Sequence, residues 1–124
     1  MSQHEPIAIV GIGGLFPDAL DPDRYWENVA AGRCAAREVP EGRWLLPPER
    51  VFGPAKGAPD KVYSRKGCFV EGFAFDPEGL DLPSGLAREL DPVFHFALHA
   101  GRQAFSDSKT AELDRRRVGV ILGN

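Results

Sequence analysis

The 124-residue sequence predicts an α/β fold, of which the chain contains only a part. Two short apolar runs, Ile7–Gly11 and Val118–Leu122, are rich in β-branched residues and are typical of strands buried on both faces of a sheet. Two segments with apolar residues at helical spacing lie between them. A doubly buried strand needs neighbouring strands and helices on both faces, and this chain supplies too few of either. We therefore expect it to be part of a larger layered domain.

The composition favours an ordered protein and argues against several classes of partner. Hydrophobic residues make up 43% of the chain and charged residues 27%, which is enough for one domain or part of one. The net charge is -3, and Arg115–Arg117 is the one basic triplet, so we expect neither nucleic-acid nor anionic-lipid binding. The longest apolar run, Ile7–Phe16, falls short of the roughly 18 to 20 residues that span a bilayer.

Localisation is predicted from the amino terminus and the cysteines. No basic segment precedes the first apolar run, as it would in a secretory signal. The chain has 2 cysteines, too few for a disulfide framework. Both observations favour a reducing cytoplasm.

The first strand and the first helix are predicted by their end signals. The run Ile7–Gly11 ends on glycine, and Gly11–Gly14 turns the chain. Asp21 and Pro22 then form an N-cap followed by proline at the first helical position, and Gly32 is the expected stop. Between them, apolar residues recur at helical spacing at Tyr25, Trp26, Val29 and Ala30.

The middle of the chain is predicted to lack long regular elements. Residues 39–59 hold the prolines Pro40, Pro47, Pro48, Pro54 and Pro59, and we expect an ordered surface loop anchored by Trp44 and Phe52. Farther on, Val62–Arg65 and Cys68–Val70 flank Lys66–Gly67, which allows a hairpin-like or extended pair.

A second helix is predicted from Pro92 to Phe105, after the N-cap Asp91. One face carries the apolar stripe Phe94, Ala97, Leu98, Gly101 and Phe105, and the other carries His95, His99, Arg102, Gln103 and Ser106. The strand at Val118–Leu122 follows.

The glycine turn after the first strand invites comparison with the dinucleotide-binding fingerprint. Gly11 and Gly13 fit its first two glycines, but Phe16 stands at the third, where a ring blocks close packing of the helix. We interpret these glycines as residues that let the strand turn sharply, which argues against a nucleotide-binding oxidoreductase piece.

The histidines and cysteines form no recognisable reactive site. His95 and His99 share one helix face, but no zincin glutamate and no further ligand at a known spacing accompany them, so we expect a face toward solvent or the domain. Arg65 and Lys66 near Cys68 would favour a thiolate, yet no Cys-His signature surrounds it. We expect Cys68, and Cys34 as well, to be free structural thiols. Trp26, Trp44 and the phenylalanines are expected to anchor the core and the loop.

Several motifs in order resemble a known family. The segment Glu5–Pro17 resembles the opening of the β-ketoacyl synthase (ketosynthase) domain of type I polyketide synthases and multifunctional fatty acid synthases. Nearly the whole chain continues the resemblance, through the segments Tyr25–Asn28, Ala31–Arg33, Glu38–Pro40, Gly42–Trp44, Asp60–Phe69, Phe75–Pro77, Leu90–Pro92 and Val118–Val120 with Gly123.

Three departures from the family pattern indicate a divergent branch. Val93–His95 replaces Gln-Gln-Arg, His99 and Arg102 replace a glutamate and a tryptophan, and Glu78–Ser84 replaces an aromatic pair with Gly-Ile-Ser-Pro. The differences suggest similarity to the polyunsaturated-fatty-acid-synthase type.

The resemblance implies a fold, a mechanism and partners. The fold is thiolase-like, with αβαβα layers, of which this chain is the incomplete N-terminal part; the family acts as a homodimer. A cysteine at a helix N-terminus takes an acyl chain from the phosphopantetheine arm of an acyl carrier protein. Two histidines then promote decarboxylation of a malonyl-type extender, whose enolate attacks the acyl thioester.

In the family those three residues lie beyond the strand that Val118–Leu122 resembles. We therefore expect no catalytic, cofactor-binding or metal-binding residue in this chain, and no such role for Cys34, Cys68, His4, His95 or His99. The phosphopantetheine would be carried by the partner, and none would be bound directly.

The resulting interpretation is an N-terminal ketosynthase fragment, with residues 1–5 as a short leader and residues 6–124 as the ketosynthase-like part. Whether the chain itself is an enzyme stays open, because it lacks the nucleophile. The alternative is a non-catalytic thiolase-like module for dimerisation or carrier-protein docking, which should fold cooperatively alone. A fragment with an unpartnered apolar strand should instead aggregate or stay partly molten.

Overall fold

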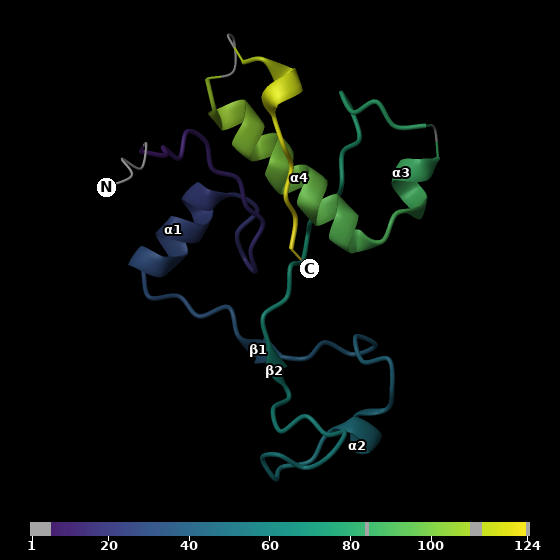
Figure 1. Cartoon of the computed structure of the whole chain (residues 1–124). Coiled ribbons are helices and arrows are strands. Elements are labelled where there is room, and N and C mark those ends of the chain that lie inside the picture. Colours follow the sequence, from purple (N-terminus) through teal and green to yellow (C-terminus); the bar gives the residue numbers. More distant parts are fainter. Residues whose placement is uncertain (1–5, 84, 110–112, 124) are drawn as a thin grey trace, which may run out of the picture.

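The computed structural model describes residues 6–83, 85–109 and 113–123 (Figure 1). Both predicted helices are present, whereas the sheet within the described residues consists of two very short strands. The elements in chain order are α1 (Pro22–Ala30), β1 (Arg37–Glu38), α2 (Pro48–Val51), β2 (Lys66–Gly67), α3 (Leu86–Glu89), α4 (Pro92–Asp107) and the 3-10 helix η1 (Arg115–Arg117).

Helix α1 begins and ends where its capping residues predict. The Asp21 side chain accepts a hydrogen bond from the backbone N–H of Arg24 at 2.7 Å, and Pro22 follows the cap. Gly32 has φ 62°, a conformation that favours glycine and ends the helix. The expected burial of its apolar stripe is wrong: Trp26 is 69% exposed, and the buried residue of α1 is Asn28.

Helix α4 is the centre of the upper part of the molecule, as Figure 1 shows. It is capped by Asp91, which accepts from the N–H of Val93 at 2.9 Å. Its apolar stripe forms a groove with Val120 and Leu122, near the carboxyl end of the described chain. The face with the histidines instead contacts the aromatic rings of Phe73 and Phe75 and the carbonyl oxygens of Ala87 and Leu20.

The glycine turn packs against a third face of α4. A Cβ atom on Gly11 would overlap the carbonyl oxygen of Ala104, and one on Gly13 would overlap that of Ala100. The backbone N–H of Ile12 donates to Asp107 at 2.9 Å, on the same face. The predicted turn therefore has a further purpose: the missing side chains let the chain approach the helix backbone closely.

Both predicted strands are wrong as strands of this structure. Residues 7–11 and 118–122 form no strand, and they pair with no other strand in the described part of the chain. Ile7 and Ile121 are each 97% exposed, and Ile9 is 84% exposed. The physical reason is that an apolar run becomes a buried strand only where neighbours supply ladder hydrogen bonds and a covering layer.

Of the two alternatives expected around Lys66–Gly67, a hairpin-like or an extended pair, the hairpin is not formed and the segment is extended. Those two residues are strand β2, and they pair antiparallel with β1, with Arg37 opposite Gly67 and Glu38 opposite Lys66. The segment between the strands forms the lower part of the molecule in Figure 1, and it contains the short helix α2. Phe52 forms a bridge to Val62 and is half-buried, as is Trp44, in agreement with their expected anchoring of this loop.

Few side chains are buried. Among the described residues, Ala19 is the buried apolar residue, at 1% exposure, and Asn28 is the buried polar one. The chain exposes 10858 Å². A compact monomer of this length would expose about 6,500 Å².

Candidate functional site

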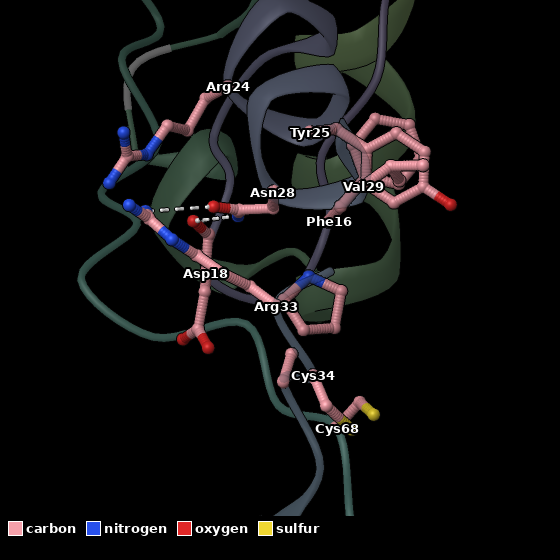
Figure 2. Close-up of a pocket in the computed structure, with 11 residues that line it drawn as sticks. Phe16, Asp18, Arg24, Tyr25, Asn28, Val29, Arg33, Cys34 and Cys68 are labelled. Atoms are coloured by element: carbon pink, nitrogen blue, oxygen red, sulfur yellow. Dashed lines mark hydrogen bonds between the residues drawn. The ribbon is translucent and has the colours of Figure 1, made fainter. Parts of the chain in front are cut away.

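A pocket of about 590 Å³ lies beside helix α1 (Figure 2). It is lined by the turn at residues 16–18, by α1, by residues 33–35 after α1 and by Cys68 after β2. Its lining residues include two guanidinium groups, one carboxylate and both cysteines, namely Arg24, Arg33, Asp18, Cys34 and Cys68. This pocket brings together side chains that are distant in the sequence.

The turn beneath the pocket is held by backbone and aromatic contacts. Phe16 and Ala19 exchange backbone hydrogen bonds of 2.8 and 3.0 Å. Asp18, between them, has φ 58°, a left-handed conformation that aspartate tolerates better than most residues. The Phe16 ring stacks on Tyr25 of α1, with centroids 4.2 Å apart. These contacts fix the turn against the helix.

Asn28 is the polar anchor of the pocket wall. Its Nδ2 donates to the carbonyl oxygen of Asp18 at 3.1 Å, and its Oδ1 accepts from Nη1 of Arg33 at 3.3 Å. Figure 2 shows both bonds. A buried side-chain amide is stable only when its donor and acceptor are satisfied, and both are satisfied here. Asn28 therefore couples the turn, the helix and the chain beyond it.

Arg37 ties three segments together beside the pocket. Its guanidinium forms ion pairs of 2.9 Å with Asp18, in the turn, and with Glu71, after β2. A further bond of 3.4 Å runs to the carbonyl oxygen of Phe69. The hydrogen bond to Asp18 is the main cause of a raised pKa of Arg37. Sequence reasoning did not single out this cluster, because its members are far apart in the sequence and Glu71 reaches Arg37 beside the pairing of β1 with β2.

The structure brings Cys34 and Cys68 to one pocket; both are free, as predicted, and both are exposed. No histidine lines this pocket among the described residues, so the arrangement offers no Cys-His pair. Sequence reasoning considered each cysteine alone and missed their shared location.

His95 and His99 are engaged by the rest of the domain. Nε2 of His95 lies 2.6 Å from the carbonyl oxygen of Ala87, and its ring stacks on Phe75 with centroids 4.4 Å apart. His99 packs edge-on against Phe73. Of the two alternatives, a face toward solvent or toward the domain, the structure shows the second. His4 lies outside the described residues, and no group of three or more possible metal ligands occurs within them.

The exposed extended segments are the second candidate site. Segment 7–12 includes four large apolar side chains that are 60 to 97% exposed, and segment 118–122 includes three that are 72 to 97% exposed. Unpaired apolar strands are surfaces that other strands complete. The chain exposes about 4,000 Å² more than a compact monomer. That excess is larger than the roughly 1,000–2,500 Å² that each partner buries in most permanent interfaces.

No helix within the described ranges has the length and apolar character needed to cross a membrane.

Comparison with known proteins agrees with the family resemblance. The model of the family "Beta-ketoacyl synthase, N-terminal domain" matches residues 4–124. The chain is 36% identical to polyketide synthase ThaG of Burkholderia thailandensis, over 96% of this chain and 2% of that protein. It is 31% identical to polyketide synthase PksL of Bacillus subtilis, over 97% of this chain and 3% of that protein. The chain thus spans a small share of these relatives.

Two solved structures are similar in fold. The PfaC keto synthase-chain length factor aligns with a TM-score of 0.71 and 27% identity, over 83% of this chain and 11% of that one. The oxazolomycin ketosynthase domain OzmH KS7 of Streptomyces albus aligns with a TM-score of 0.62 and 33% identity, over 80% of this chain and 17% of that one.

These ketosynthase domains have the thiolase-like fold, so the predicted fold class is confirmed, with the chain as an incomplete part of it. The exposed segments 7–12 and 118–122 are consistent with that incompleteness. The chain belongs to the β-ketoacyl synthase family and corresponds to the N-terminal part of its ketosynthase domain.

Proposed function

We propose that this chain is the amino-terminal structural part of a condensing enzyme of polyketide or fatty acid biosynthesis. The complete domain joins an acyl thioester to a malonyl-type extender by decarboxylative Claisen condensation. The observation that carries the proposal is the exposure of the two extended segments in a chain that matches the family over residues 4–124. Ladder pairing with further strands would cover these segments.

The proposed role of these residues is to support a site built elsewhere. Within the described residues, no histidine lines the pocket of Cys34 and Cys68, and His95 and His99 are packed against Phe75 and Phe73. We therefore place the acylated cysteine and the two catalytic histidines outside residues 1–124. The chain is not expected to condense substrates alone.

We infer the partners from the same family membership. The acyl carrier protein would bring the substrate on its phosphopantetheine arm, and this chain would hold no cofactor of its own. The complete domain would act as a homodimer, as its relatives typically do. Since the 2 cysteines form no disulfide framework, we propose a cytoplasmic enzyme.

The first test is acylation of the intact ketosynthase domain that includes residues 1–124, with a radiolabelled acyl thioester followed by peptide mapping. The label is expected on one cysteine outside this chain. The double variant C34S/C68S should retain acylation and condensation. Label on Cys34 or Cys68, or loss of condensation in both C34S and C68S, would contradict the proposal.

A second test addresses the alternative of a self-sufficient docking module. The 124-residue chain alone is expected to bind a hydrophobic dye and to unfold without a sharp transition, because its extended segments lack partners. Cooperative unfolding of a monomeric chain, together with carrier-protein binding, would instead favour the module.

A further inference from the structure

The two cysteines of the chain line one pocket, although the sequence separates them widely. Both thiols are free and exposed. Figure 2 shows Cys34 and Cys68 together at one end of the pocket, away from the Asn28 hydrogen bonds at the other. No acyl-transfer role is assigned to either of them, so their shared location is unexplained by the proposed function.

The register of the small sheet accounts for this location. Arg37 pairs with Gly67 and Glu38 with Lys66, antiparallel. The next pair in that register is Ala36 with Cys68. Cys34 lies two residues before Ala36, so it belongs to the same face of the pair as Cys68. Continued beyond the two observed pairs, this register would make Cys34 and Cys68 diagonal neighbours, roughly 7–8 Å apart in a regular ladder, and their shared pocket agrees with that placement.

The segment that carries Cys34 has room to move. A disulfide requires Cβ atoms about 3.8 Å apart, so the two cysteines must approach by a few ångströms. The N–H of Arg33 is held by the carbonyl oxygen of Asn28 at 2.9 Å, and the ladder begins at Arg37. Between these points, the described residues show no backbone hydrogen bond from 34–36 to the facing chain. A small shift of this link costs no ladder bond.

We propose that Cys34 and Cys68 form a redox-sensitive pair that closes to an intramolecular disulfide in the presence of a low-molecular-weight disulfide. One cysteine thiolate attacks a sulfur of the small disulfide, and the first small thiolate leaves. The second cysteine thiolate then attacks the mixed disulfide and expels the other small thiolate. Two cysteine thiols are oxidised to one disulfide, the small disulfide is reduced to two thiols, and the cysteine protons pass to them.

The disulfide would join the chain after α1 to the chain after β2. It would close a loop that contains both strands, α2 and the proline-rich segment 39–59. The same two segments are already joined through Arg37, which pairs with Asp18 and with Glu71. The covalent bond would therefore strengthen an existing connection across the pocket.

In the test, the intact ketosynthase domain that includes residues 1–124 is equilibrated with mixtures of reduced and oxidised glutathione. Acid quenching, alkylation and tryptic mapping follow. The expected product has lost two hydrogen atoms relative to the reduced protein. It contains the peptide Cys34–Arg37 linked to the peptide Gly67–Arg88. The variants C34S and C68S serve as matched controls, and each is expected to form no internal link.

A denaturant comparison shows whether the fold itself favours the pair. The measurement is the ratio of reduced to oxidised glutathione at which half of the protein carries the disulfide. This ratio should be higher in the native protein than in guanidinium chloride by about tenfold or more, because the fold raises the effective concentration of one thiol near the other. Equal ratios in both conditions would overturn the proposal. So would mixed disulfides of glutathione with each cysteine in place of the internal link.

Discussion

Single hydrogen atoms in place of side chains decide how the amino-terminal segment packs. Gly11 and Gly13 meet backbone carbonyl groups of α4 so closely that a methyl group cannot be accommodated without a shift. Gly101 lies within α4 and faces open space. Apart from the backbone of the helix and the two neighbouring residues, a methyl group there would have no atom of the described residues within 4 Å. The two kinds of glycine therefore respond oppositely to the same substitution.

Gly13→Ala is expected to lower the free energy of unfolding by about 1–3 kcal/mol, because the overlap with Ala100 forces the segment away from the helix. Gly101→Ala should raise it by up to about 1 kcal/mol, because alanine is the better helix former in an open position. Urea unfolding of the intact ketosynthase domain that includes residues 1–124, followed by circular dichroism, measures both. Equal effects of the two substitutions would refute the close packing of the amino-terminal segment on α4.

Arg37 shows how one charged residue joins distant segments. In the intact ketosynthase domain, Arg37→Met is expected to lower the urea midpoint of unfolding, and the deficit should shrink in high salt. The folded pKa of Arg37 is raised, so its contribution is present at all pH values below the unfolded pKa and is lost only above ordinary pH. The deficit should thus stay constant between about pH 6 and pH 9 as far as Arg37 is concerned.

The control for Arg37 is Arg116→Met. Arg116 pairs with Asp114 at 3.4 Å, but its side chain is 93% exposed, so its removal should change the midpoint very little. An equal decrease of the urea midpoint in both variants would mean that the ion pairs of Arg37 do not stabilise the fold.

At the scale of elements, the helices were predictable because their signals are local. Asp21 with Pro22 and Asp91 with Pro92 mark both helix starts, and the structure places a cap bond at each. The strands failed for the opposite reason. An apolar run such as Ile7–Gly11 carries no information on whether a neighbouring strand is present to receive it.

The same limit applies to the candidate site. The sequence predicted Cys34 and Cys68 as free thiols, because this prediction needs only the number of cysteines and the residues next to each. Their common pocket and the Asp18–Arg37–Glu71 cluster depend on β1 pairing with β2. A strand of two residues is too short to show the alternation of apolar and polar side chains that marks a strand in a sequence, so this pairing could not be predicted.

The cap of α4 gives a prediction at this scale. Asp91→Ala should cost about 0.5–2 kcal/mol of stability, because the N–H of Val93 loses its acceptor. Asp91→Ser, which can also cap, should recover most of that loss. Thermal unfolding of the intact ketosynthase domain, as wild type and as the two variants, provides the measurement, and indistinguishable alanine and serine variants would show that the cap bond is unimportant.

The molecule as a whole has too much surface for its length, and most of its large apolar side chains lie on that surface. Their distribution matters. Ile121 and Leu45 are equally exposed, at 97% and 101%, but Ile121 belongs to an unpaired extended segment and Leu45 to the proline-rich loop. Only the first is expected to mediate association with other strands.

Ile121→Lys should therefore reduce self-association of the 124-residue chain, as measured by sedimentation velocity, because a lysine at an unpaired edge opposes strand pairing. In the complete ketosynthase domain, the same substitution should impair folding. Leu45→Lys is the matched control and should change neither property. Identical sedimentation of the wild-type chain and Ile121→Lys would show that segment 118–122 does not mediate self-association.

The position of α4 also determines the timing of folding during protein synthesis. The N–H of Ile12 bonds to Asp107, 95 residues later. At roughly 5–20 residues per second, the ribosome needs about 5–20 s to make that stretch. Throughout this interval the first apolar segment has no helix to pack on, and it is accessible to chaperones. Slow codons before α4 would prolong the interval, whereas a faster ribosome would shorten it.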